Sequence, residues 1–200
     1  MSNKHLRVRS KWRDSKSNVT LEENATALAY IAWQIALDKT RNLHREDFDY
    51  EDDDQRTGVL AEYLCFLIHV ADRLSFTSLD ADARAAFVST LAQQAARHYQ
   101  RNLEDVYGHG SDYSSRFIEL VNNRIEEYSA YGFDSNQPGY TMMRGLGRHA
   151  QDLMGDTQAN RWVIDQVMEI DAPEAVLELK NGMDSLFGTA NVMSNMNPPE

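Results

Sequence analysis

Two histidine–aspartate pairs are the residues of this sequence whose types and spacing are best suited to chemistry. His69 and Asp72 lie three residues apart, and so do His149 and Asp152. Residues at this spacing share one face of a helix, and a helical bundle can bring two such faces together. Imidazole and carboxylate groups are ligands for iron, manganese or zinc. The pairs therefore suggest a metal-binding bundle or a metal-dependent enzyme that uses all four side chains.

The surrounding pattern argues against this metal hypothesis. A di-iron bundle needs Glu-x-x-His on two of its helices, and this spacing occurs nowhere in the sequence. On a helix, Glu62, His69 and Arg73 also point directly away from the centre of the neighbouring apolar face. We therefore favour a solvated polar strip with local His–Asp or Glu–Arg contacts, and we expect no cofactor.

The helix that carries the first pair must be enclosed by others. In the segment 59–74, apolar side chains cover more than half of the helical circumference. Cys65 flanks the polar strip one turn before His69, so a nucleophilic thiol is conceivable only with a base in contact. A lone cysteine among apolar residues is more often a small buried hydrophobe, and we prefer that interpretation.

Arg144 and Arg148 form a candidate anion contact. They flank Gly145-Leu146-Gly147, which combines cations with small residues. The strand, glycine-rich loop and helix that build a phosphate cradle are missing. Close approach of another helix to the two glycines is therefore the interpretation that we favour.

The charge is distributed very unevenly. The chain of 200 residues has a net charge of −11, which argues against general nucleic-acid binding. Residues 1–17 contain six basic residues against Asp14 alone, or +5, which leaves −16 for the rest. Seven carboxylates fall within 46–54 and predict a solvated loop; their spacing fits no EF-hand.

Residues 1–17 are expected to form an extended basic arm. Alternation in this N-terminal arm places its apolar side chains on one side and its cations on the other. The residues predicted to make contact with another chain are Leu6, Arg7, Val8, Arg9 and Trp12. The opposite charges favour a homodimer in which the arm of one subunit lies over the acidic loop of another. A disordered tail is the alternative.

Apolar residues at helical spacing predict the fold class as all-α. The expected helices cover 21–43, 59–74, 77–106, 112–128, 141–154 and 160–169, and a last one follows Asp171-Ala172-Pro173-Glu174 and stops at Gly188. We expect a multi-helix bundle of four longer helices with shorter C-terminal helices packed on it. The predicted organisation is a basic arm (1–17), one helical domain (18–188) and a frayed tail (189–200).

The cysteine count and the length of the apolar runs indicate the compartment, whereas the function is left as three hypotheses. The single cysteine permits no internal disulfide, and no apolar run is long enough to span a membrane; both favour a cytoplasmic protein. The leading hypothesis is a non-enzymatic bundle that acts through a protein partner or self-association, although nothing in the sequence decides whether it is an enzyme. A small-ligand pocket is a third hypothesis, since methionines line adaptable apolar sites; the residues concerned are Met142, Met143, Met154 and Met168.

Overall fold

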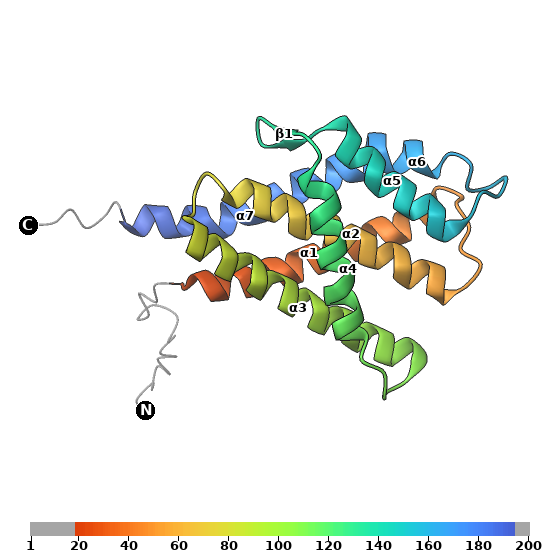
Figure 1. Ribbon diagram of the computed structural model, residues 1–200, viewed down its shortest axis with the longest axis horizontal. Coiled ribbons are helices and arrows are strands. Elements are labelled where there is room, and N and C mark those ends of the chain that lie inside the picture. Colours follow the sequence, from red (N-terminus) through yellow and green to blue (C-terminus); the bar gives the residue numbers. More distant parts are fainter. Residues whose placement is uncertain (1–18, 195–200) are drawn as a thin grey trace, which may run out of the picture.

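The computed structural model describes residues 19–194, with side chains described as far as residue 187. The predicted N-terminal arm therefore lies outside the described residues, and so does the end of the predicted tail, 195–200. The described chain is all-α, as expected from the apolar periodicity (Figure 1). Its elements are α1 (Leu21–Arg45), α2 (Asp53–Ser75), α3 (Ala81–Tyr107), α4 (Tyr113–Ser129), β1 (Phe133–Asp134), β2 (Gln137–Pro138), α5 (Tyr140–Met154), α6 (Val163–Gln166), the π-helical turn η2 (Val167–Asp171) and α7 (Ala172–Ser194).

Side-chain caps explain where the first four helices begin. Thr20 and Glu23 form the predicted capping box of α1, with Thr20 Oγ1 accepting from the Glu23 amide at 3.1 Å. Asp52, Asp80 and Asp112 accept amide hydrogen bonds at the starts of α2, α3 and α4. The acidic block is therefore not all loop: α2 begins at Asp53, inside the segment expected to be solvated.

Helix α2 lies in the middle of the bundle and contacts α1, α3, α4, α5 and α7 (Figure 1). The predicted enclosure of 59–74 is confirmed, because every residue of α2 from Val59 to Ala71 is buried. A single hydrophobic cluster includes side chains from α1 through α7. Burial of this apolar surface is the main force that holds the helices together.

A short β-hairpin with a two-residue turn connects α4 to α5. Strands β1 and β2 pair antiparallel, with Phe133 opposite Pro138. Ser135 and Asn136 between them have φ angles of 52° and 59°, the left-handed conformation that a type I′ turn requires at both central positions. The Gly139 amide donates to the Gly132 carbonyl at 2.8 Å, which closes the hairpin and sets the start of α5.

The C-terminal helices differ from the prediction. Helix α7 begins at Ala172, as the Asp171–Glu174 signal predicted, but it continues from α6 and η2 without a break, and the Asp171 side chain bonds to other helices instead of capping it. The Ala172 amide donates to the Val167 carbonyl, five residues back. This wider turn accommodates Pro173, which cannot donate to the preceding turn and would clash with it in an ordinary helix. Helix α7 also continues past Gly188 and is as long as α2, with 23 residues each.

The π-helical turn places the Asp171 carboxyl group inside the bundle, where the side chain is 0% exposed. Its oxygens accept hydrogen bonds from the hydroxyl of Tyr63 at 3.0 Å and from Asn42 Nδ2 at 3.1 Å. Burial raises the pKa of Asp171, and these hydrogen bonds oppose the rise. The turn thus connects α7 to α1 and α2. Within residues 19–194, no helix is both long and apolar enough to cross a membrane.

Candidate functional site

The polar face of α2 is not solvated, which corrects the expectation for this helix. Glu62 is 4% exposed and His69 is 2% exposed. Arg73 is half-buried and donates to the Tyr131 carbonyl at 2.9 Å. The apolar periodicity identified the face toward the core correctly, but α4 and the hairpin cover the opposite face as well. The contacts of Glu62 and Arg73 are therefore between elements rather than within the helix.

The four side chains of the metal hypothesis lie in different surroundings. Asp72 accepts two hydrogen bonds from Arg84, at 2.6 and 3.2 Å. His149 contacts Glu127, and Asp152 is exposed. Within the described chain, no three histidine, cysteine, aspartate or glutamate side chains could hold an ion together. The metal hypothesis therefore stays a prediction without a shared set of ligands to support it.

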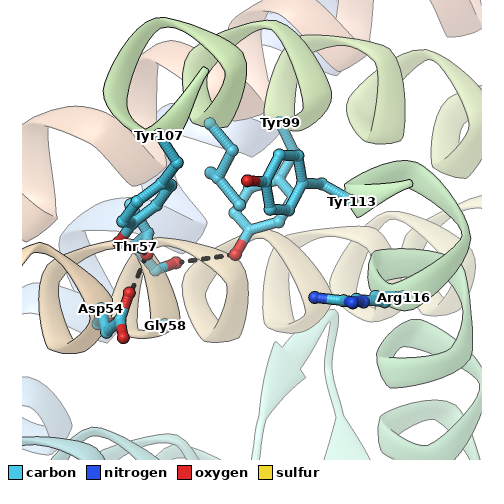
Figure 2. Close-up of a pocket in the computed structure, with 8 residues that line it drawn as sticks. Asp54, Thr57, Gly58, Tyr99, Tyr107, Tyr113 and Arg116 are labelled. Atoms are coloured by element: carbon cyan, nitrogen blue, oxygen red, sulfur yellow. Dashed lines mark hydrogen bonds between the residues drawn. The ribbon is translucent and has the colours of Figure 1, made fainter. Parts of the chain in front are cut away.

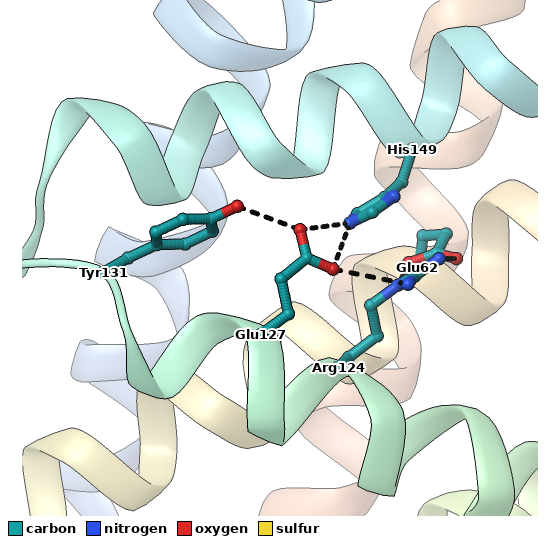
Figure 3. A network of polar contacts seen from close by, with 5 residues as sticks. All are labelled: Glu62, Arg124, Glu127, Tyr131 and His149. Atoms are coloured by element: carbon teal, nitrogen blue, oxygen red, sulfur yellow. Dashed lines mark hydrogen bonds and ion pairs between the residues drawn. The ribbon is translucent and has the colours of Figure 1, made fainter.

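A network of charged side chains joins α2, α4 and α5 (Figure 3). Arg124 of α4 donates to both carboxylate oxygens of Glu62 at 2.7 Å, the bidentate geometry of a strong ion pair. Glu127 accepts from Arg124 at 3.4 Å and from the Tyr131 hydroxyl at 3.0 Å. His149 Nε2 lies 3.0 Å from Glu127 Oε2. The Glu62 hydrogen bond raises the pKa of Arg124, so the guanidinium stays charged.

This network was missed at the level of the sequence. Arg124 and Glu127 have the spacing of a helical ion pair, but the partner that matters most, Glu62, lies 62 residues earlier. No local pattern connects them. Among the predicted site residues only His149 belongs to the network, where it contacts a carboxylate of α4 instead of Asp152.

His69 and Tyr128 form an unusual buried pair beside the network. Their ring centroids lie 5.5 Å apart. Neither ring nitrogen of His69 has a hydrogen-bond partner, and the Tyr128 hydroxyl has none either. Burial lowers the pKa of His69 to about 4, and the guanidinium of Arg73 acts in the same direction. The imidazole is therefore neutral at physiological pH.

The two glycines of α5 allow other elements to approach, as we expected. A Cβ on Gly147 would lie 2.9 Å from the Ile164 carbonyl oxygen, and one on Gly145 would lie 3.1 Å from the Tyr131 ring. The glycines therefore serve packing, whereas the flanking arginines, Arg144 and Arg148, do not. Both arginines are exposed, and both line the same pocket with Gly145.

We expect Gly147→Ala to lower the free energy of unfolding by about 1–2 kcal/mol, measured by urea denaturation. Alanine gains about 1 kcal/mol of helix propensity, but here a backbone oxygen must move to make room. Gly58→Ala is the matched control, because its Cβ would meet only the end of the Leu153 side chain at 3.1 Å. Equal effects of the two substitutions would contradict the close contact at Gly147.

A tyrosine-lined pocket of about 330 Å³ lies between α2, α3 and α4. Figure 2 shows Tyr99 and Tyr107 extending from α3 toward α2, with Arg116 on α4. Tyr99 donates to the Thr57 carbonyl at 3.3 Å. Burial raises the pKa of Tyr107 to about 12, and a hydrogen bond to Asp54 adds to the rise. The polar groups of this pocket are largely occupied by one another.

The other predicted candidates are part of the core. Cys65 is buried, and burial raises the pKa of its thiol well above the usual value, which favours the unreactive protonated form. Met142, Met154 and Met168 are buried and Met143 partly so. They fill space in the core, which is the alternative to a small-ligand pocket.

An open, largely apolar groove of about 770 Å³ lies between α3 and α4, and we call it the α3–α4 groove. One wall comes from α3 and contains Ala85, Val88 and Ala92; the other comes from α4 and contains Ile118 and Ile125. The α3 side of the groove borders the core, since Ala92 belongs to the core cluster and Val88 packs against it, whereas Ala85 is exposed. No protein-family model, curated protein or solved structure matches the chain.

Proposed function

We propose that this protein acts through protein–protein interaction, and that its first partner is a second copy of itself bound at the α3–α4 groove. The observation that carries the proposal is the apolar lining of this groove. Seven of its twelve lining residues are alanine, valine or isoleucine, over three turns of α3 and two of α4; the others are Asp72, Arg84, Ser89, Gln93 and Asn122. Contiguous apolar surface that a soluble chain leaves uncovered marks a site of interaction.

The proposed occupant is the N-terminal arm of the other copy. Its sequence provides Leu6, Val8 and Trp12 for an apolar groove, and tryptophan is among the residues that contribute most to interfaces. Its net charge of +5 is attracted to a body of −16. At physiological salt this attraction acts over about 8 Å, so charges beside the groove matter most.

Exposed carboxylates neighbour the groove in the sequence. Asp82, Glu119 and Glu126 directly follow residues 81, 118 and 125, which line it. Of the charged groups inside the groove, Asp72 and Arg84 neutralise each other in an ion pair at 2.6 Å. A basic and apolar segment therefore suits both the apolar lining of the groove and the carboxylates next to it in the sequence.

The acidic block 46–54 is a weaker place for the arm than we first expected. Asp52 caps α2 and Asp53 pairs with Arg56. Phe48, an apolar residue of the block, is buried. This surface offers charge but little apolar contact, so the α3–α4 groove is the better match. A cytoplasmic location remains part of the proposal, supported by a single cysteine, Cys65, that is buried and free.

We expect Ala85→Arg to weaken self-association at least about tenfold, which corresponds to about 1.4 kcal/mol. The new side chain fills the groove and repels a basic segment. Ala86→Arg is the matched control, because Ala86 is exposed on the same helix but does not line the groove. Sedimentation equilibrium gives the dimer dissociation constant for both variants and for a chain lacking residues 1–17.

The proposal predicts that the parent chain and Ala86→Arg are dimers, whereas Ala85→Arg and the truncated chain are monomers. A synthetic peptide of residues 1–17 should bind the truncated chain but not the truncated Ala85→Arg variant. Peptide binding together with a monomeric parent chain would place the arm in its own groove and overturn self-association. Dimers that persist in Ala85→Arg would overturn the groove as the interface.

A further inference from the structure

The outer face of α5 carries a basic pocket in an otherwise acidic protein. Arg144 and Arg148 lie one helical turn apart and line a cavity of about 450 Å³, the arginine pocket. Tyr131, Tyr140 and Thr141 line it as well. This volume falls in the range of sites for small molecules. The arginine pocket shares no lining residue with the α3–α4 groove.

The two guanidinium groups are available to a ligand. Among the side chains described to residue 187, no carboxylate forms an ion pair with Arg144 or Arg148 (the pairs present are those of Lys39, Arg45, Arg56, Arg84, His109, Arg124 and His149). Glu127, which bonds to Tyr131 of the pocket wall, is already held by Arg124, Tyr131 and His149. The charge that faces the pocket is therefore positive.

The start of α5 adds further donors. Gly139 caps this helix without a side chain, whereas α1 to α4 are each capped by a threonine or aspartate oxygen. The amides of the first turn, at Tyr140 and Thr141, belong to residues that line the pocket. Together with the helix dipole, first-turn amides favour an anion. The Thr141 hydroxyl is a third kind of donor in the same cavity.

Two tyrosine rings form the rest of the wall. The ring of Tyr131 packs against Gly145, where a Cβ would approach it to 3.1 Å, so the absence of a side chain between the arginines lets the ring lie against α5. Arg148 is close enough to Tyr131 to oppose the rise in its pKa that burial and Glu127 cause. Tyr140 is 62% exposed at the rim. The cavity thus pairs cations with flat apolar surfaces.

We propose that the arginine pocket binds a small phosphorylated molecule, with the phosphoryl group between Arg144 and Arg148 and a flat apolar group against Tyr131 and Tyr140. A carboxylate has two coplanar oxygens that one guanidinium satisfies. A phosphate monoester has three terminal oxygens, which suit two guanidiniums together with hydroxyl and amide donors from other directions. The cavity is larger than inorganic phosphate needs, so it has room for the organic group of a phosphate ester beside the tyrosines.

Isothermal titration calorimetry on the full chain tests this site with three probes: phenyl phosphate, inorganic phosphate and benzoate at constant ionic strength. We expect phenyl phosphate to bind tightest. Benzoate, which keeps the ring and one negative charge, should bind at least about tenfold more weakly. Arg144→Gln and Arg148→Gln should each weaken phenyl phosphate binding about tenfold or more, and the double variant should abolish it.

Arg97→Gln is the matched control, because Arg97 is also exposed on a helix but lies outside the pocket. Its binding of phenyl phosphate should equal that of the parent chain. Circular dichroism checks that the exposed substitutions leave the helices intact. Equal losses in all three arginine variants would show attraction to charge alone and overturn the site. Benzoate binding as tight as phenyl phosphate, or a phosphotyrosine peptide binding tighter than either, would overturn the proposed ligand class.

Discussion

Replacing Arg124 with methionine should lower the free energy of unfolding by about 3 kcal/mol. The substitution leaves Glu62 without a cation in a position where its side chain is only 5% exposed. It also removes the hydrogen bond to Glu127, which then faces His149 and Tyr131 alone. An unpaired charge in the interior costs far more than an exposed ion pair contributes. Guanidinium denaturation followed by circular dichroism measures the effect.

The same ion pair should be less costly to remove as a whole. In Glu62→Leu/Arg124→Met no buried charge remains, so we expect most of the lost stability to return, and the two single effects should not add. Arg45→Met is the control: Arg45 and Asp38 form an ion pair at 3.6 Å with both side chains more than half exposed, and its loss should cost under about 1 kcal/mol. Additive effects of Glu62→Leu and Arg124→Met would show that the two groups do not interact.

This ion pair marks the limit of what the sequence predicts about α2. Apolar periodicity identifies which side chains of 59–74 face the core, and it identified the enclosure of the helix correctly. It cannot show that a second helix covers the remaining polar face, because that depends on a partner charge at Arg124. A buried glutamate and a solvated one have the same local sequence, and only the tertiary partner distinguishes them.

The C-terminal helices show a different limit. Asp171 and Pro173 are a strong local signal for the start of a helix, and α7 does begin at Ala172, but the chain enters it from the π-helical turn that ends at Asp171 instead of from a capped loop. The reason lies in tertiary contacts: the carboxyl group of Asp171 bonds to Tyr63 and Asn42 instead of capping its own helix. The local signal predicts where α7 begins, but the predicted cap forms only when no distant group competes for the same side chain.

The sequence predicted the arginines of the arginine pocket but not its walls. The sequence shows that Arg144 and Arg148 share a helix face beside two glycines. It does not show that Tyr131 and Tyr140 close the cavity, because their placement depends on the hairpin turn at Ser135 and Asn136 between α4 and α5. The sequence therefore identified the two arginines, but it did not predict the cavity that they line.

His69 should make the protein lose stability in mild acid. The unfolded chain takes up a proton on this imidazole near pH 6.5, whereas the folded protein does so only near pH 4. Between these values the unfolded state binds more protons, so the free energy of unfolding falls as the pH falls. The loss from this one group should reach about 3 kcal/mol at pH 4. Urea denaturation from pH 7.5 to 4 measures it.

His69→Leu isolates the contribution, because leucine has no proton to gain and no ring nitrogen to leave unpaired. We expect the stability of the variant to depend less on pH than that of the parent, with the two curves diverging below pH 6.5. The raised pKa of Asp171 acts in the opposite direction, since its protonation in acid favours the folded state. That effect is common to both proteins and cancels in the difference.

His44→Leu provides the matched control, because His44 is exposed at the end of α1 and its curve should follow that of the parent. Parallel curves for the parent and His69→Leu would mean that the folded protein protonates His69 as readily as the unfolded chain does. A charged imidazole at this depth needs an acceptor. Tyr128 offers two neighbouring acceptors, its backbone, which already acts to raise the pKa of His69, and its unused hydroxyl oxygen, so that result would make the buried pair a polar contact of the folded state.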